Sequence, residues 1–204
     1  PINNGGIALQ WWIKNNIKHD LAETDYEQLF GEIAHIKAGS NGLLFLPYLT
    51  GDRAPIWDSE SCGVFFGIKL EHGKAHFSRA VLEGICYAMY DVLDALQENA
   101  EPIKQINISG GIVKSDVWMQ IMADITGKDL VITQTEDASG VGAALLAMKA
   151  LGLVHDYSDL LNKTPKMVNP NTNNGEVYLR NFRIFKTLYS DLKNTMHEFY
   201  KMNL

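Results

Sequence analysis

Cysteine is scarce in this sequence: Cys62 and Cys86 are the only two among 204 residues. They form neither a CxxC pair nor a spacing typical of metal ligands, which predicts reduced thiols in a cytoplasmic protein. The six histidines show no ligand spacing either, since Gly73 lies between His72 and His76 just before a predicted helix. No apolar run approaches the ~18 residues of a membrane span. We therefore expect neither a metal site nor a membrane helix.

Several motifs of common enzymes are also missing. The sequence has neither the GxGxxG pattern of dinucleotide-binding folds nor the GxxxxGK[ST] pattern of P-loop proteins. It has no nucleophile elbow and no recognisable order of serine, histidine and aspartate. These absences exclude the Rossmann and P-loop modes of phosphate binding and give no sign of a hydrolase triad.

The composition is that of an ordinary folded domain. Hydrophobic residues make up 46% of the chain and aromatic residues 10%, which allows one sizeable core and excludes a disordered chain. The net charge of −6 argues against a large surface for nucleic acid or for an anionic membrane. Phosphate ligands remain compatible with this charge, because proteins usually hold phosphate with backbone N–H groups and one metal ion.

Hydrophobic periodicity and glycine positions predict a series of helices and strands. Helices are expected at residues 6–19, 25–38, 78–99, 116–126, 138–151 and 182–202, and strands at residues 43–46, 63–67, 103–109 and 130–133. Residues 162–176 are rich in Asn, Pro and Thr and are predicted to form a loop. Gly84 interrupts a helix at a cost of about 1 kcal/mol relative to alanine, so a close contact is expected there. The order of elements in the second half predicts an α/β fold.

The segment with the clearest functional signal is residues 106–118 (INISGGIVKSDVW). A predicted strand ends at Gly110 and Gly111, where the missing Cβ atoms would let a flat ligand approach the backbone. Ser115 is a good N-cap for the next helix, and its hydroxyl could instead reach a base or a ribose. Taken alone, the same residues are more typical of an ordinary tight turn without a ligand.

Two further segments carry weaker signals. Gly6 and Gln10 are four residues apart at the start of the first helix and would therefore lie on one face of it. Residues 137–144 (DASGVGAA) contain small side chains that would let a helix pack very closely on a sheet. Such packing would serve the core alone or would also shape one wall of a ligand cleft.

Residues 50–58 (TGDRAPIWD) form a long predicted loop that mixes charge, glycine, proline and tryptophan. Long ordered loops in compact domains are often functional. Arg53, Asp52 and Asp58 would form either a solvated salt-bridge cluster or a group that lies over the cleft.

In their order along the chain, these segments resemble the FGGY family of carbohydrate kinases, which phosphorylate sugars and polyols with ATP. Each motif alone is unspecific, whereas the ordered set over roughly residues 3–155 is specific. The matching pieces are residues 4–6 (NGG), Gln10 and Trp11, 45–48 (FLPY), 51–55 (GDRAP), 63–67 (GVFFG), 79–85 (RAVLEGI), 109–111 (SGG), 118–124 (WMQIMAD) and 138–144 (ASGVGAA).

The resemblance implies a two-domain fold of the ribonuclease-H-like, actin-like ATPase type, with the active site between the domains. Residues 1–204 would then be the C-terminal nucleotide-binding domain, incomplete at its N-terminus and lacking the N-terminal sugar-binding domain. In the family, residues matching Gly6 and Gln10 lie near the nucleotide, and residues matching Gly111 and Ser115 lie at the adenine. Gly110 is expected at the same site. The family's catalytic aspartate lies upstream of the matched segment, so no catalytic residue or metal ligand is assigned in this chain.

The implied activity is transfer of the γ-phosphoryl group of ATP, with Mg²⁺, to a hydroxyl of a sugar or sugar acid. Residues 2–6 (INNGG) look most like the gluconate kinases, and the xylulose kinases are the next closest. The expected partners are ATP and a small sugar or sugar acid, without nucleic acid or membrane, and family members are often oligomeric, so a homo-oligomer is an option. Two alternatives stay open: a nucleotide-binding module of an actin-like ATPase without sugar kinase activity, and a fragment that is inactive alone.

Overall fold

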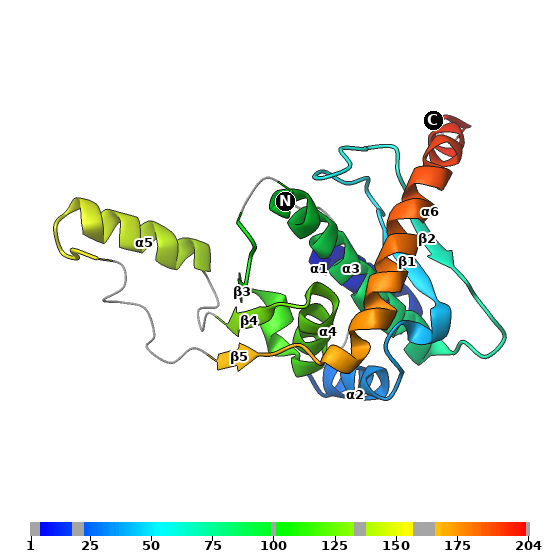
Figure 1. The fold of residues 1–204 in the computed structure, drawn as a ribbon, viewed down its shortest axis with the longest axis horizontal. Coiled ribbons are helices and arrows are strands. Elements are labelled where there is room, and N and C mark those ends of the chain that lie inside the picture. The colour runs from blue at the N-terminus through cyan, green and yellow to red at the C-terminus, as the bar shows by residue number, and fades with distance from the viewer. Residues whose placement is uncertain (1–4, 18–22, 99–100, 133–137, 157–165, 203–204) are drawn as a thin grey trace.

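The computed structural model describes residues 5–17, 23–98, 101–132, 138–156 and 166–202. Its helices and strands follow the predicted order (Figure 1). The helices are α1 (Gly5–Asn16), α2 (Glu23–Ala34), α3 (Lys74–Gln97), α4 (Asp116–Thr126), α5 (Ala138–Ala150) and α6 (Gly175–Met202). The strands are β1 (Leu44–Pro47), β2 (Gly63–Phe66), β3 (Gln105–Ile108), β4 (Asp129–Ile132) and β5 (Lys166–Val168).

Helix α3 lies at the centre of the fold and contacts α1, α2, α4, α6 and β1. Its middle section is buried all round, since every residue from 78 to 88 is shielded from solvent. Gly84 allows the closest approach: a Cβ atom at this position would collide with the carbonyl oxygen of Phe45 in β1. The close contact predicted at Gly84 is therefore confirmed, and it sets the distance between α3 and the antiparallel pair β1–β2.

A second, three-stranded sheet has the order β3-β4-β5, with β3 and β4 parallel and β5 antiparallel. Helix α4 makes the crossover between the two parallel strands, as parallel pairing requires. The helix has the predicted bounds because Ser115 caps its start and Gly127 ends it in the left-handed conformation, with φ of 62°. Strand β5 was not expected, because it is only three residues long and lies in a mostly polar segment.

Helix α6 crosses the body of the fold (Figure 1) and begins seven residues earlier than its predicted start. Tyr178 and Asn181 in this added part are buried, together with Phe182 and Phe185. At the other end of the helix, the side chains of Phe199 and Tyr200 are exposed. Among the described residues, no helix combines the length and the apolar character that crossing a bilayer requires.

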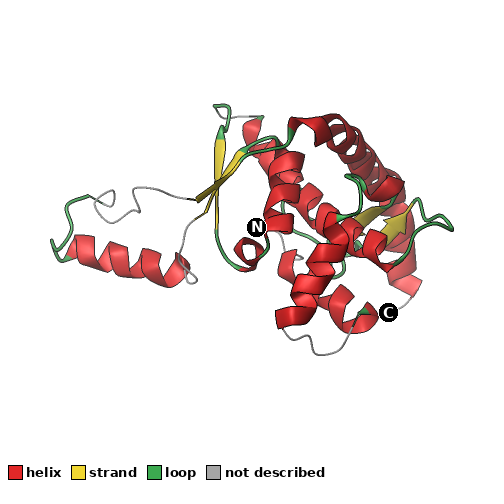
Figure 2. Ribbon diagram, turned by 90° about the horizontal axis from the view of Figure 1, so that it is seen from below, coloured by secondary structure: helices red, strands yellow, loops and turns green. Residues whose placement is uncertain are grey.

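The expectation that the small-residue helix packs closely on the sheet is wrong for the described residues. Both views show α5 apart from the rest of the fold (Figure 1, Figure 2), and a Cβ atom built at Gly142 would meet nothing within 4 Å. One face of the sheet is already covered by α4, against which Leu130 and Ile132 are buried. The alternate side chains of a strand point to the opposite face, and in β3 these are the exposed Gln105 and Asn107. A polar face gives an apolar helix little to bury against.

Some predicted positions lie outside the described residues: Thr133, Asp137 and the predicted loop residues 162–165.

Candidate functional site

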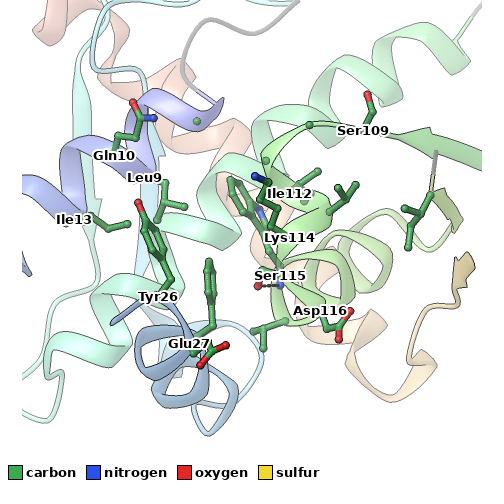
Figure 3. Close-up of a pocket in the computed structure, with 18 of the residues that line it drawn as sticks. Leu9, Gln10, Ile13, Tyr26, Glu27, Ser109, Ile112, Lys114, Ser115 and Asp116 are labelled. Atoms are coloured by element: carbon green, nitrogen blue, oxygen red, sulfur yellow. Dashed lines mark hydrogen bonds between the residues drawn. The ribbon is translucent and has the colours of Figure 1, made fainter. Parts of the chain in front are cut away.

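An open cleft of about 1200 Å³ lies between two parts of the chain that are distant in sequence. Helices α1 and α2 line one side, and residues 109–118, which follow β3, line the other (Figure 3). Ligand pockets of small molecules typically measure about 300–1,000 Å³, so the cleft has room for a ligand as large as a nucleotide.

Helix α1 contributes Gly6 and Gln10 to the cleft, on one face as their spacing predicts. Leu9 and Ile13 lie on the same side, with their side chains directed toward α2 in Figure 3. A Cβ atom at Gly6 would meet nothing within 4 Å, so the backbone there is open to a ligand. The first turn of α1 contains no acidic residue, and the N-terminus of a helix favours negative charge. This end of the cleft is therefore suited to an anionic group.

The predicted glycine turn forms the opposite wall. Gly110 has φ of 83° and ψ of −157°, a conformation that is essentially restricted to glycine. A 3₁₀ turn at Gly111–Lys114 follows, and Cβ atoms built at Gly110 or Gly111 would meet nothing within 4 Å. Both glycines thus leave backbone exposed along the cleft without filling any packing role within the described chain.

Ser115 lines the cleft and also caps α4. Its Oγ accepts a hydrogen bond of 3.2 Å from the backbone N–H of Trp118, and its side chain is buried. The hydroxyl proton is not used by this cap, so Ser115 can still donate a hydrogen bond to a ligand acceptor. All five residues predicted to bind nucleotide, Gly6, Gln10, Gly110, Gly111 and Ser115, line this one cleft.

Helix α2 supplies cleft residues that the sequence analysis missed. Tyr26, Glu27 and Phe30 all line the cleft, and the rings of Tyr26 and Phe30 stack with centroids 6.4 Å apart and an angle of 22° between their planes. Figure 3 shows Tyr26 rising from α2 toward Ile13 and Leu9 of α1. The available signal was the spacing of four residues between the two aromatic side chains, which places them on one helix face.

The loop at residues 50–58 does not line this cleft. Asp52 and Asp58 are buried and their backbones pair with each other, with Asp52 N to Asp58 O at 2.8 Å. Asp58 binds helix α6 through the hydroxyl of Tyr189 at 2.8 Å and Nε2 of His197 at 2.8 Å. Burial raises the pKa of Asp58, but the hydrogen bonds from His197 and Tyr189 outweigh it and hold that pKa below its ordinary value. The loop is thus anchored to α6, and it is neither a solvated ion-pair cluster nor a cover of the cleft.

No group of three or more His, Cys, Asp or Glu side chains among the described residues could hold a metal ion. His72 and His76 lie with ring centroids 5.4 Å apart. The Nδ1 atom of His72 faces the backbone N–H of Lys69, and that of His76 faces the N–H of Gly73. These Nδ1 atoms accept hydrogen bonds, so the lone pair of each is already engaged by the backbone.

Comparison with known proteins identifies the family. Residues 2–151 match the C-terminal domain of the FGGY family of carbohydrate kinases. The chain belongs to this family. A gluconokinase from Bacillus licheniformis is 36% identical over 95% of this chain and 40% of its own length. A xylulose kinase from Staphylococcus epidermidis is 33% identical over 92% of this chain and 38% of its own.

A solved structure agrees with the sequence comparisons. The crystal structure of a gluconate kinase from Lactobacillus acidophilus superposes with a TM-score of 0.86 at 33% identity, covering 98% of this chain and 40% of that one. The α/β fold of the actin-like ATPase type and the carbohydrate kinase family predicted from the sequence are thereby confirmed. The chain spans about 40% of the length of the FGGY relatives that it matches.

Proposed function

We propose that residues 1–204 are the nucleotide-binding C-terminal domain of an ATP-dependent carbohydrate kinase, and that the cleft between α1, α2 and residues 109–118 holds the adenosine part of ATP. The observation that carries this proposal is the convergence of Gly6, Gln10, Gly110, Gly111 and Ser115 on one cleft. These residues come from two motifs about a hundred residues apart in sequence. An ordinary tight turn at Gly110 would not need the exposed backbone of Gly6 opposite it.

The proposed reaction transfers the γ-phosphoryl group of ATP to a hydroxyl of a sugar or sugar acid. Such transfer depends on positioning and on electrostatic stabilisation of the phosphoryl group rather than on covalent chemistry by the protein. In this proposal the described chain orients the nucleotide, while the sugar contacts and the catalytic base belong to residues outside it. Closure of the two domains would exclude water, which otherwise competes as the acceptor.

The described residues do not form a carboxylate cluster for Mg²⁺. Kinases usually hold Mg²⁺ with the substrate phosphates, waters and only one or two carboxylates, so we assign no magnesium ligand in this chain. The domain's own contribution is to hold the nucleotide so that the polyphosphate leaves the cleft toward the N-terminus of α1.

Gluconate is the proposed acceptor, because a gluconokinase and a gluconate kinase are among the relatives at 33–36% identity. Xylulose is the second candidate, supported by a xylulose kinase at 33% identity.

Activity with both compounds is measured by coupled ATP consumption in the natural full-length protein and in residues 1–204 alone. We expect turnover with gluconate in the full-length protein and none in the isolated chain, and clear turnover by the isolated chain would refute the assignment of the base to residues outside it. We also propose that the protein is cytoplasmic.

The nucleotide assignment is tested by Gly111→Val in the full-length protein. The structure leaves space for the new side chain, so the fold should persist while the branched Cβ blocks approach to the backbone. We expect ATP affinity to fall at least tenfold in a calorimetric titration, with Gly142→Val on the distant helix α5 as the matched control. Unchanged affinity in the Gly111 variant would show that the adenosine does not bind against this wall of the cleft.

A further inference from the structure

The cleft has an aromatic side that no glycine motif predicts. Tyr26 and Phe30 lie one helical turn apart on α2 and both line the cleft. The side chain of Tyr26 is 37% exposed although it is stacked on Phe30. Exposed aromatic rings beside a cleft bind flat ligands well, because every nucleobase has a face that can stack on them.

Charge is distributed unevenly around the same cleft. Asp116 and Lys166, which both line it, neutralise each other in an ion pair of 2.9 Å. Among the described residues, this leaves Glu27 and Lys114 as the charged cleft residues without a hydrogen-bonding or ionic partner. In the view of Figure 3, Glu27 and Lys114 lie on opposite sides of Ser115. A carboxylate repels phosphate, so the polyphosphate of a bound nucleotide must lie away from Glu27.

We propose that Tyr26 and Phe30 form the surface on which the base of ATP stacks, and that Glu27 accepts a hydrogen bond from the exocyclic amino group of adenine. This inference rests on the proposed nucleotide function of the cleft and adds the residues that select the base. Helix α2 then discriminates among purines, whereas the glycine turn only leaves room for them.

The chemistry of the purines predicts which nucleotide binds more tightly. Adenine carries an amino group at its sixth position, which is a donor that matches the carboxylate of Glu27. Hypoxanthine and guanine carry a carbonyl oxygen there, which would face the carboxylate without a proton between them. Two acceptors that face each other form no hydrogen bond and repel, so ITP should bind more weakly than ATP.

Stacking is tested with Tyr26→Leu and Phe30→Leu, singly and together, in the full-length protein. Leucine keeps apolar bulk on α2, so packing of the helix is largely retained. We expect the double variant to bind ATP about tenfold more weakly, since stacking of a base on aromatic side chains contributes directly to its affinity. Binding of tripolyphosphate, which has no base, should not change. Tyr200→Leu, at an exposed aromatic residue on α6, is the control.

Base selection is tested with Glu27→Gln, by titration with ATP and with ITP. Glutamine can accept from an amino group or donate to a carbonyl, so we expect the ratio of ITP to ATP dissociation constants to fall about tenfold. Glu198→Gln on α6 should leave this ratio unchanged. If the wild-type protein binds ATP while the Tyr26, Phe30 and Glu27 variants match it in affinity and in selectivity, this inference is wrong and the proposed function stands. If the wild-type protein binds neither nucleotide, both are wrong.

Discussion

The guanidinium of Arg79 donates a hydrogen bond of 2.7 Å from Nε to Oε1 of Glu83, one turn further along α3. Both side chains are buried. Tyr178 of α6 donates to the same oxygen of Glu83 over 3.0 Å, and Ser40 donates to the other oxygen over 2.9 Å. Arg79 also reaches the carbonyl oxygen of Ile33 at the end of α2, at 3.1 Å. One ion pair therefore joins α2, α3, α6 and the turn at Ser40.

Replacement of Glu83 by alanine should destabilise the domain strongly. Removal of one partner of a buried pair leaves the other charge uncompensated, at a cost of about 3–5 kcal/mol. The free energy of unfolding, measured by urea denaturation, should fall by this amount. Lys166→Ala breaks an ion pair of 2.9 Å whose side chains are 57% and 82% exposed, and it should cost less than about 1 kcal/mol. Equal losses in the two variants would contradict the role given to burial.

The anchoring of Asp58 predicts a pH dependence of stability. The pKa of Asp58 is lowered below its ordinary value of 3.8 by the hydrogen bonds from His197 and Tyr189, against the opposing effect of burial. A carboxyl whose pKa is lower in the folded state stabilises the fold above its unfolded pKa and loses this contribution as the pH falls through the folded pKa.

Denaturation of the wild type and of Asp58→Asn should therefore be compared at pH 6 and at pH 3. The wild type should be the more stable at pH 6, and its advantage should shrink at pH 3. Asp191→Asn, at an exposed position on the same helix as His197, serves as the control. An advantage that stays constant with pH would show that Asp58 contributes only as a polar group.

Two glycines in helices predict opposite effects of the same substitution. Alanine is preferred over glycine in a helix by about 1 kcal/mol, so Gly31→Ala on α2, where nothing lies within 4 Å, should stabilise the domain by roughly this amount. Gly84→Ala places its methyl group against the carbonyl oxygen of Phe45, and such overpacking costs about 1–3 kcal/mol. Thermal unfolding should therefore shift upward for Gly31→Ala and downward for Gly84→Ala. A stabilised Gly84→Ala variant would mean that α3 and β1 can separate without loss.

The sequence predicts those parts of the fold whose signals are local. Helix α4 has the predicted bounds because Ser115 and Gly127 mark its ends with specific backbone chemistry. The contact at Gly84 was predictable for a similar reason, since a glycine within a long apolar helix implies a close neighbour. In each case the deciding residues lie within the element itself.

Features that depend on distant partners were missed. Arg79 and Glu83 look like an ordinary surface pair on a helix, and only Tyr178 and Ser40 show why both charges can be buried.

Strand β5 and the aromatic side of the cleft were missed for the same reason. The strand exists because Val168 and Lys166 pair with β4, although its own composition resembles a loop. Tyr26 and Phe30 belong to the cleft because α2 lies opposite residues 109–118, which no pattern within α2 reveals. The glycine motifs thus predicted Gly6 and residues 109–111 at the cleft, but not the aromatic side chains that α2 contributes.

The hydroxyl group of Ser115 has two proposed roles, as the cap of α4 and as a hydrogen-bond donor to ATP, and substitutions can distinguish them. Its hydroxyl oxygen caps α4 through the N–H of Trp118, and replacement of such a cap by alanine costs about 1 kcal/mol. Asparagine caps helices as well as serine does, and its amide can also donate to a ligand. Ser115→Ala should therefore lower both the free energy of unfolding and the affinity for ATP, whereas Ser115→Asn should preserve both. The two quantities are measured by urea denaturation and calorimetry. A loss of stability in Ser115→Ala with unchanged ATP affinity would make Ser115 a helix cap alone and would leave Gly111 as the residue of this wall that contacts the base.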